Sequence, residues 1–118
     1  LDRAYRLPSG LLVLVEFKTR SSNQPCLSDV IQLSAQRMAV MGQAGLAVAS
    51  HAYVMVKTQA GRSLPTAHCV ELMSDDQVIA LIRRRDNLLA GRLLPRRPLS
   101  LRTCDTCSFR GRCSGFSH

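Results

Sequence analysis

One stretch near the N-terminus restricts the fold more than any other part of this 118-residue chain. Residues 11–18 read Leu-Leu-Val-Leu-Val-Glu-Phe-Lys, so apolar side chains occupy successive positions instead of alternating with polar ones. Such a run is typical of an interior strand that is covered on both faces. It is also too short to cross a bilayer. We therefore expect a helix-covered sheet in a protein that does not enter a membrane.

A second extended segment, residues 2–7, precedes this run, and the turn tripeptide Pro8-Ser9-Gly10 separates the two. We expect a β-hairpin. If Leu7 pairs with Leu11 across a three-residue loop, Asp2 lies opposite Glu16 on the same face of the hairpin. A two-residue loop would instead turn Asp2 to the other face, because a one-residue slip reverses every side chain.

The rest of the chain predicts an α/β order followed by an irregular tail. Periodicity predicts a helix over residues 28–41, with Ser28 and Asp29 available for capping and Gly42 and Gly45 ending it. A strand pair is expected over residues 51–57 and 66–72 around a turn at Gly61. A second helix is expected over residues 75–90, with a capping box of Ser74 and Gln77. We therefore predict a mixed sheet flanked by helices in residues 1–94. Residues 95–118 lack any periodic apolar pattern and form a cysteine-rich basic tail.

Positive charge is concentrated toward the C-terminus. Residues 1–82 hold 7 basic and 6 acidic side chains, whereas residues 83–118 hold 9 basic and 2 acidic ones. Such a concentration favours a polyanionic partner such as DNA, since Lys and Arg release counterions condensed on phosphates. The alternative is a solvated, solubilising surface.

Two charged residues, Glu16 and Lys18, interrupt the end of the apolar strand. Residues i and i+2 of a strand share a face, so these side chains lie side by side. Together with Asp2 they would provide two carboxylates and a lysine, a set that suits Mg²⁺ or Mn²⁺ and a phosphate substrate. The metal would lower the pKa of bound water for phosphodiester hydrolysis. The alternative is a structural Glu-Lys ion pair.

Asp2, the glycine-containing turn and Leu-Val-Glu-Phe-Lys-Thr at residues 14–19 resemble the PD-(D/E)XK nucleases, most closely their RecB-like branch. The resemblance implies a restriction-endonuclease-like core in which Asp2 and Glu16 bind metal and Lys18 assists the nucleophile. It also implies a glutamine beside them on the next helix, and Gln32 is the matching position. The branch has Gln-x-x-x-Tyr there, whereas this chain has Gln36 in place of the tyrosine.

The tail carries the pattern Cys104-x2-Cys107-x5-Cys113, which indicates a metal site. Structural zinc and iron-sulfur clusters usually take four ligands. Candidates for the fourth are Cys26, Cys69 and His118, although the strand pattern around Cys69 makes it an expected core residue. An odd total of five cysteines argues against a disulfide framework and for a reducing compartment, the cytoplasm.

The same tail spacing resembles the iron-sulfur RecB-like nucleases, which include the fourth CRISPR-associated protein family and the helicase-nucleases of recombination. This resemblance implies a [4Fe-4S] cluster on Cys104, Cys107 and Cys113, with zinc as the alternative. In those proteins the first cluster cysteine precedes the nuclease core. We therefore expect the N-terminal part of the family fold to be missing from this chain.

These features predict a Mg²⁺- or Mn²⁺-dependent deoxyribonuclease, an exonuclease acting on single-stranded or double-stranded DNA ends. Other nucleic-acid-processing proteins are expected partners, and a membrane is not. One alternative is a non-catalytic DNA-binding module with a structural zinc or iron-sulfur site. Another is a nuclease relic that acts through protein contacts.

Overall fold

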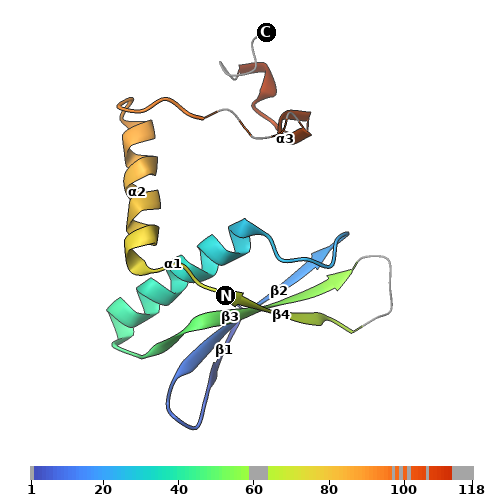
Figure 1. Ribbon diagram of the computed structural model, residues 1–118, viewed down its shortest axis with the longest axis vertical. Coiled ribbons are helices and arrows are strands. Elements are labelled where there is room, and N and C mark those ends of the chain that lie inside the picture. The colour runs from blue at the N-terminus through green and yellow to red at the C-terminus, as the bar shows by residue number, and fades with distance from the viewer. Residues whose placement is uncertain are drawn as a thin grey trace. The chain divides into compact units, whose positions relative to one another are not determined.

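The computed structural model describes residues 2–58, 64–96, 98, 100, 102–105 and 107–112. These residues form, in chain order, β1 (Arg3–Arg6), β2 (Leu12–Arg20), α1 (Leu27–Ala44), β3 (Val48–Thr58), β4 (Thr66–Glu71), α2 (Asp75–Leu89), α3 (Arg102–Asp105) and the 3-10 turn η1 (Arg110–Arg112) (Figure 1). The predicted mixed α/β class is confirmed. None of the helices in these described ranges is long and apolar enough to cross a membrane.

The chain packs as two compact units, residues 1–80 and residues 81–118, and α2 continues from the first into the second. The first unit contains the whole sheet. The division into residues 1–94 and 95–118 stays a prediction.

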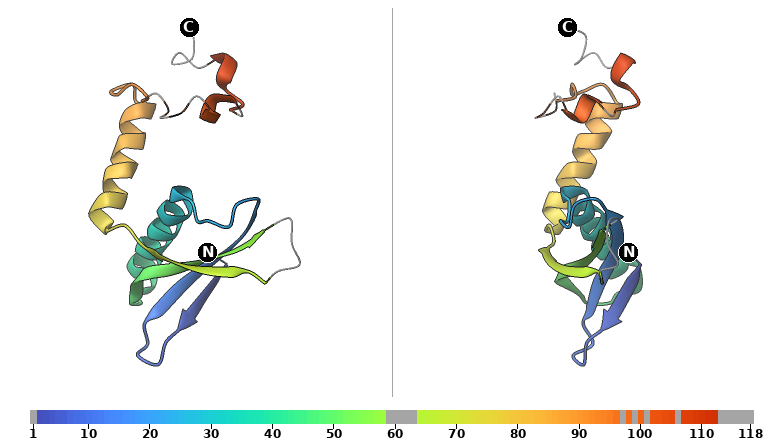
Figure 2. Two further views of the ribbon diagram at one scale, coloured as in Figure 1. Left: turned by 45° about the vertical axis from the view of Figure 1, so that its right-hand side comes forward. Right: turned by 90° about the vertical axis from the view of Figure 1, so that its right-hand side faces the viewer.

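The four strands form one mixed sheet in the order β1-β2-β3-β4. β2 runs parallel to β3, whereas the pairs β1-β2 and β3-β4 are antiparallel. A parallel pair needs a long crossover connection, and α1 provides it. Figure 2 shows α1 lying against one face of the sheet. β2 is therefore an interior strand, as its apolar run predicted.

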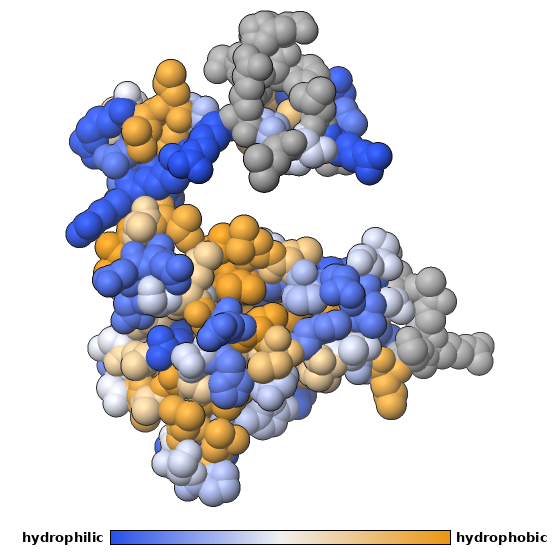
Figure 3. Space-filling model, viewed as in Figure 1, coloured by the Kyte–Doolittle hydropathy of each residue, from blue (hydrophilic) through white to orange (hydrophobic). Residues whose placement is uncertain are grey.

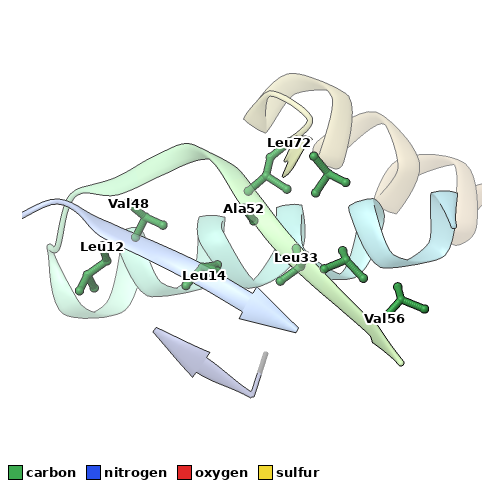
Figure 4. Packing of buried hydrophobic residues seen from close by; sticks show 9 residues of the cluster. Leu12, Leu14, Leu33, Val48, Ala52, Val56 and Leu72 are labelled. Atoms are coloured by element: carbon green, nitrogen blue, oxygen red, sulfur yellow. The ribbon is translucent and has the colours of Figure 1, made fainter. Parts of the chain in front are cut away.

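The hydrophobic core lies between α1 and the sheet face that it covers. Leu14 and Val56 of the sheet and Leu33 of α1 are at most 1% exposed there (Figure 4). Full burial of such a side chain stabilises the fold by roughly 1.5–3 kcal/mol. On the opposite face, Val13 and Val15 are buried as well. The prediction that β2 is covered on both faces is thus confirmed for residues 12–15.

The hairpin has the register expected for a three-residue loop. Arg3 pairs with Val15 and Arg6 with Leu12. The Leu7 N–H donates to the Leu11 carbonyl at 2.9 Å. Gly10 adopts φ +87°, a left-handed conformation that glycine reaches without the penalty of a Cβ. The three-residue loop is therefore confirmed, whereas the position of Asp2 opposite Glu16 stays a prediction, because the last paired residue of β1 is Arg3.

Both ends of α1 differ from the prediction. Its N-cap is Cys26, not Ser28, and Asp29 contributes from the third helical position by accepting the Cys26 N–H at 2.8 Å. The helix continues through Gly42 and ends where Gly45 takes a left-handed φ of 63°. Gly42 is not among the glycines with a positive φ, so only the second glycine acts as a terminator.

The capping box predicted for α2 is confirmed. The Ser74 N–H donates to the Gln77 side chain at 2.9 Å, and the Gln77 N–H donates to the Ser74 hydroxyl at 3.3 Å. The predicted strand pair over residues 51–57 and 66–72 is confirmed as β3 and β4. Its turn around Gly61 lies outside the described residues.

Candidate functional site

Asp2 binds the backbone on either side of Glu16. Its N–H donates to the Val15 carbonyl at 3.0 Å, and its carboxylate Oδ2 accepts the Phe17 N–H at 2.6 Å. These two bonds continue the hairpin one residue beyond the last paired residue, Arg3. The Asp2 side chain is exposed, and its Oδ1 makes no hydrogen bond within the described ranges. One carboxylate oxygen thus has a role in the fold, and the other is not bound by any described residue.

Glu16 and Lys18 form an ion pair on the face of β2 that α1 covers. Lys18 Nζ lies 3.4 Å from Glu16 Oε1. The Glu16 side chain is only 7% exposed, whereas Lys18 is 31% exposed. Removing a carboxylate from water is costly unless a partner compensates its charge. The lysine therefore stabilises the buried carboxylate and keeps its own head within reach of solvent.

Arg20 and Asp29 form a second ion pair, which the sequence interpretation did not predict. Arg20 Nη1 and Nη2 each donate to one Asp29 oxygen at 2.6 Å, in a two-pronged arrangement that is among the strongest that side chains make. Nη1 also donates to the Gln24 carbonyl at 3.1 Å. The pair joins the end of β2 to the first turn of α1. A clue was present in the alternation Glu16, Lys18, Arg20, which sets three charges on one face of the strand.

Asp29 is 2% exposed, and its environment favours the ionised form. The hydrogen bonds from Arg20 hold the pKa of this carboxyl below its ordinary value, against the opposing effect of burial. The hydrogen bond from the Cys26 N–H and the charges of Arg20 and Lys18 act in the same direction as the Arg20 hydrogen bonds. In turn, the Asp29 hydrogen bond raises the pKa of Arg20. Asp29 is therefore a buried carboxylate held by several donors.

The loop between β2 and α1 is also fastened to β4. Asn23 donates from Nδ2 to the Thr66 hydroxyl at 3.1 Å, and its Oδ1 lies 3.1 Å from His68 Nε2. This contact gives His68 a structural role, because it links β4 to the loop. The loop is thus held by Arg20 at one side and by β4 at the other.

Gln32 lies on α1 with an exposed side chain. It forms no hydrogen bond with any residue in the described ranges, and the polar residue of α1 that contacts the end of β2 is Asp29. The functional assignment of Gln32 stays a prediction.

The donors at the end of the hairpin suit a hard divalent cation in their chemistry. Mg²⁺ binds through one or two carboxylates and retains water, so the two oxygen-bearing side chains Asp2 and Glu16 are a sufficient protein contribution. Within the described ranges, no group of three or more His, Cys, Asp or Glu side chains could hold a metal ion. Any cation here would thus depend on two carboxylates, on water and on the substrate.

The cysteine tail belongs to the second unit. Cys107 N–H donates to the Cys104 carbonyl at 3.2 Å, so the two cysteines lie one turn apart, as their spacing predicted. Both are free thiols. Cys113 and His118 lie outside the described residues, and the cluster stays a prediction. Cys26 is an exposed free thiol too.

The prediction that Cys69 is a core residue is wrong, because its thiol is exposed. Cys69 lies on β4, the strand at the edge of the sheet, and pairs with Tyr53 of β3. Its buried neighbour Val70 faces α1, and alternation along the strand turns Cys69 to the other face.

The second unit also carries the concentrated basic charge. Arg83, Arg84 and Arg85 are consecutive on α2, and only Arg85 has an ion-pair partner among the described residues, Asp86 at 3.3 Å. Figure 3 shows hydrophilic residues gathered over this part of α2, with hydrophobic ones beside them. Exposed arginines without acidic partners are suited to phosphate groups.

Comparisons with models of known protein families and with characterised proteins give no match for this chain.

Proposed function

We propose that this chain is the core of a metal-dependent DNA nuclease that hydrolyses phosphodiester bonds. The observation that carries the proposal is the position of Asp2, which binds the backbone before and after Glu16 while Lys18 contacts the Glu16 carboxylate. Asp2 thus contacts the same part of β2 that carries Glu16 and Lys18. This is the arrangement that the resemblance to RecB-like PD-(D/E)XK nucleases implies for Asp2, Glu16 and Lys18.

In such a site, some residues of this chain would bind the metal and others would act on the attacking water. Asp2, through the oxygen that does not bind Phe17, and Glu16 would hold Mg²⁺ or Mn²⁺. The bound ion would lower the pKa of water and stabilise charge on the phosphate. Lys18, with its partly exposed ammonium, would orient or activate the attacking water and offset negative charge at the scissile group. Gln32 is the proposed fourth member of the site.

The wider architecture supports a restriction-endonuclease-like core. The hairpin of β1 and β2 is followed by α1 and by the parallel strand β3, so the acidic strand is interior and has its helix on one face. The proposed iron-sulfur cluster on Cys104, Cys107 and Cys113 would order the tail, and zinc is the alternative metal. The arginines of α2 and the tail would contact the DNA backbone. We place this activity on DNA ends, as an exonuclease in the cytoplasm.

The test is cleavage of linear single-stranded and double-stranded DNA with Mg²⁺ or Mn²⁺. The chain contains only two glutamates and two lysines, which provides matched controls. We expect Glu16→Gln and Lys18→Ala to abolish cleavage, and Glu71→Gln and Lys57→Ala, at exposed positions, to retain it. Cleavage that survives Glu16→Gln would refute the assigned site.

A non-catalytic DNA-binding module is the second candidate, and one observation favours it. The Asp2 carboxylate already binds the Phe17 N–H, and Lys18 already compensates Glu16, so the charges have structural roles without any metal. Salt-sensitive DNA binding by the wild-type protein, without metal-dependent cleavage, would select this candidate.

A further inference from the structure

Two acidic and two basic residues form two ion pairs where β2 meets α1. Glu16, Lys18 and Arg20 lie on one face of β2, and Asp29 reaches them from α1. Both acids are almost completely buried, with side chains 7% and 2% exposed. A buried carboxylate without a counter-charge is strongly unfavourable. Each acid therefore requires a cation, and two cations are present.

Lys18 lies between Glu16 and Arg20 on one face of β2, and Arg20 binds Asp29. Its ammonium lies 3.4 Å from Glu16, and its charge also contributes to the lowered pKa of Asp29. The four-carbon stem of lysine is flexible, and its ammonium is a point charge that does not demand one geometry. The bonds that Asp29 already makes therefore bear on which acid Lys18 contacts.

Arg20 binds Asp29 so fully that the carboxylate has little capacity left for another cation. Its guanidinium binds both carboxylate oxygens, and the Cys26 N–H binds Oδ2 as well. The planar fork of arginine matches a carboxylate in a way that lysine cannot. An Asp29 that already holds three donors has little to offer to Lys18.

We propose that Arg20 is a positioning residue that keeps the Lys18 ammonium on Glu16 by occupying Asp29. Without Arg20, the buried Asp29 draws Lys18 away from Glu16. The effect on cleavage rests on the proposed nuclease function, whereas the effect on the position of Lys18 does not.

The experiment compares the wild-type protein with Arg20→Met, Arg20→Lys and the double variant Arg20→Met/Asp29→Asn. Asparagine keeps an oxygen that can accept the Cys26 N–H but removes the competing charge. Arg37→Met is the control, because Arg37 is similarly exposed (18% against 19%) and its guanidinium bonds to backbone carbonyls of β3. Crystal structures locate Lys18 Nζ, thermal melting verifies folding, and DNA cleavage gives kcat and KM separately.

We expect Arg20→Met to move Lys18 Nζ to Asp29 and to lower kcat at least about tenfold with little change in KM, because small misplacements of a site group slow chemistry strongly. The double variant should return Lys18 to Glu16 and recover kcat, although it still lacks the ion pair between residues 20 and 29. Arg20→Lys, which keeps a cation beside Asp29, should lie between wild type and Arg20→Met. Arg37→Met should leave Lys18 in place.

Two results would overturn the proposal. The first is a structure of Arg20→Met in which Lys18 still contacts Glu16. If that variant does not fold, the equivalent result is an Arg20→Lys protein in which Lys18 contacts Asp29 although kcat equals that of the wild type. The second is a double variant with kcat as low as Arg20→Met, which indicates a purely structural pair. If the wild-type protein cleaves no DNA, the nuclease proposal fails, and the crystal structures alone decide whether Arg20 directs Lys18.

Discussion

The carboxylate of Asp2 accepts the backbone N–H of Phe17 at 2.6 Å and so closes the open end of the hairpin. This contact brings an acid from β1's start to the backbone of β2 directly after Glu16. It also leaves the second oxygen of Asp2 without a hydrogen bond among the described residues. Substitutions at Asp2 can therefore separate folding from chemistry.

Asp2→Asn should keep the fold and lose the activity. Its amide oxygen can still accept the Phe17 N–H, whereas Asp2→Ala removes the acceptor and should lower the free energy of unfolding by about 1 kcal/mol. Both variants should lose metal-dependent cleavage if Asp2 is a ligand. Urea unfolding and cleavage assays on the same preparations make the comparison, and an active Asp2→Asn protein would argue against metal ligation by Asp2.

Asp29 should make the stability of the protein depend on acid pH. Its pKa is lower in the folded state than in the unfolded state, so its contribution is present above the unfolded pKa and is lost as pH falls through the folded pKa. The free energy of unfolding of the wild-type protein should therefore decline as pH falls below about 5. Asp29→Asn should be less stable near neutral pH and show a shallower decline. Urea titrations at a series of pH values measure this, and parallel curves would contradict it.

Lys18→Met should bind Mn²⁺ more tightly while losing cleavage. The ammonium 3.4 Å from Glu16 competes with any cation for that carboxylate, and its removal leaves the charge to the metal. We expect the dissociation constant for Mn²⁺ to fall by about tenfold, which corresponds to ~1.4 kcal/mol. Isothermal titration calorimetry provides the value, with Lys57→Met as a control whose affinity stays unchanged. Unchanged or weaker binding by Lys18→Met would show that the lysine and the metal do not share Glu16.

The cysteines should separate into two groups by metal content. Cys104→Ser and Cys107→Ser should lose the iron or zinc of the purified protein, because each would supply one of the thiolate ligands. Cys69→Ser should retain it, since Cys69 stands outside the tail pattern of Cys104, Cys107 and Cys113, and a loss of metal would identify Cys69 as the fourth ligand. Elemental analysis and visible absorbance distinguish iron from zinc and from neither. A metal-free wild-type protein purified without oxygen would remove the cluster from the proposal.

The hairpin could be predicted from the turn residues Pro8-Ser9-Gly10 between two extended segments. Its register could not, because the successive apolar residues of β2 suit either face and so do not select between a two-residue and a three-residue loop. The hydrogen bond between Asp2 and Phe17 could not be predicted in this way. It forms beyond the last residue pair, where the direction of a side chain is not set by a repeating pattern.

The ion pair of Arg20 and Asp29 was missed because it depends on the path of a loop. Residues 21–26 have no periodicity, so their sequence does not reveal that α1 begins beside the end of β2. Asp29 was interpreted only as a capping residue, and its capping bond to Cys26 proved to be half of its role. The exposure of Cys69 was missed for a related reason, since strand order within a sheet cannot be read from one strand's pattern.

The parallel pairing of β2 with β3 has a consequence for the order in which this protein folds. Asp2 and Phe17 contact each other across a short loop, whereas Glu16 can pair with Val54 of β3 only after all of α1 has been synthesised. Contacts between distant residues form more slowly than local ones, because more chain entropy is lost on closure. We therefore expect the two acids to come together early, on a hairpin still open to water, and Glu16 to be buried late, as the nascent chain adds its third strand.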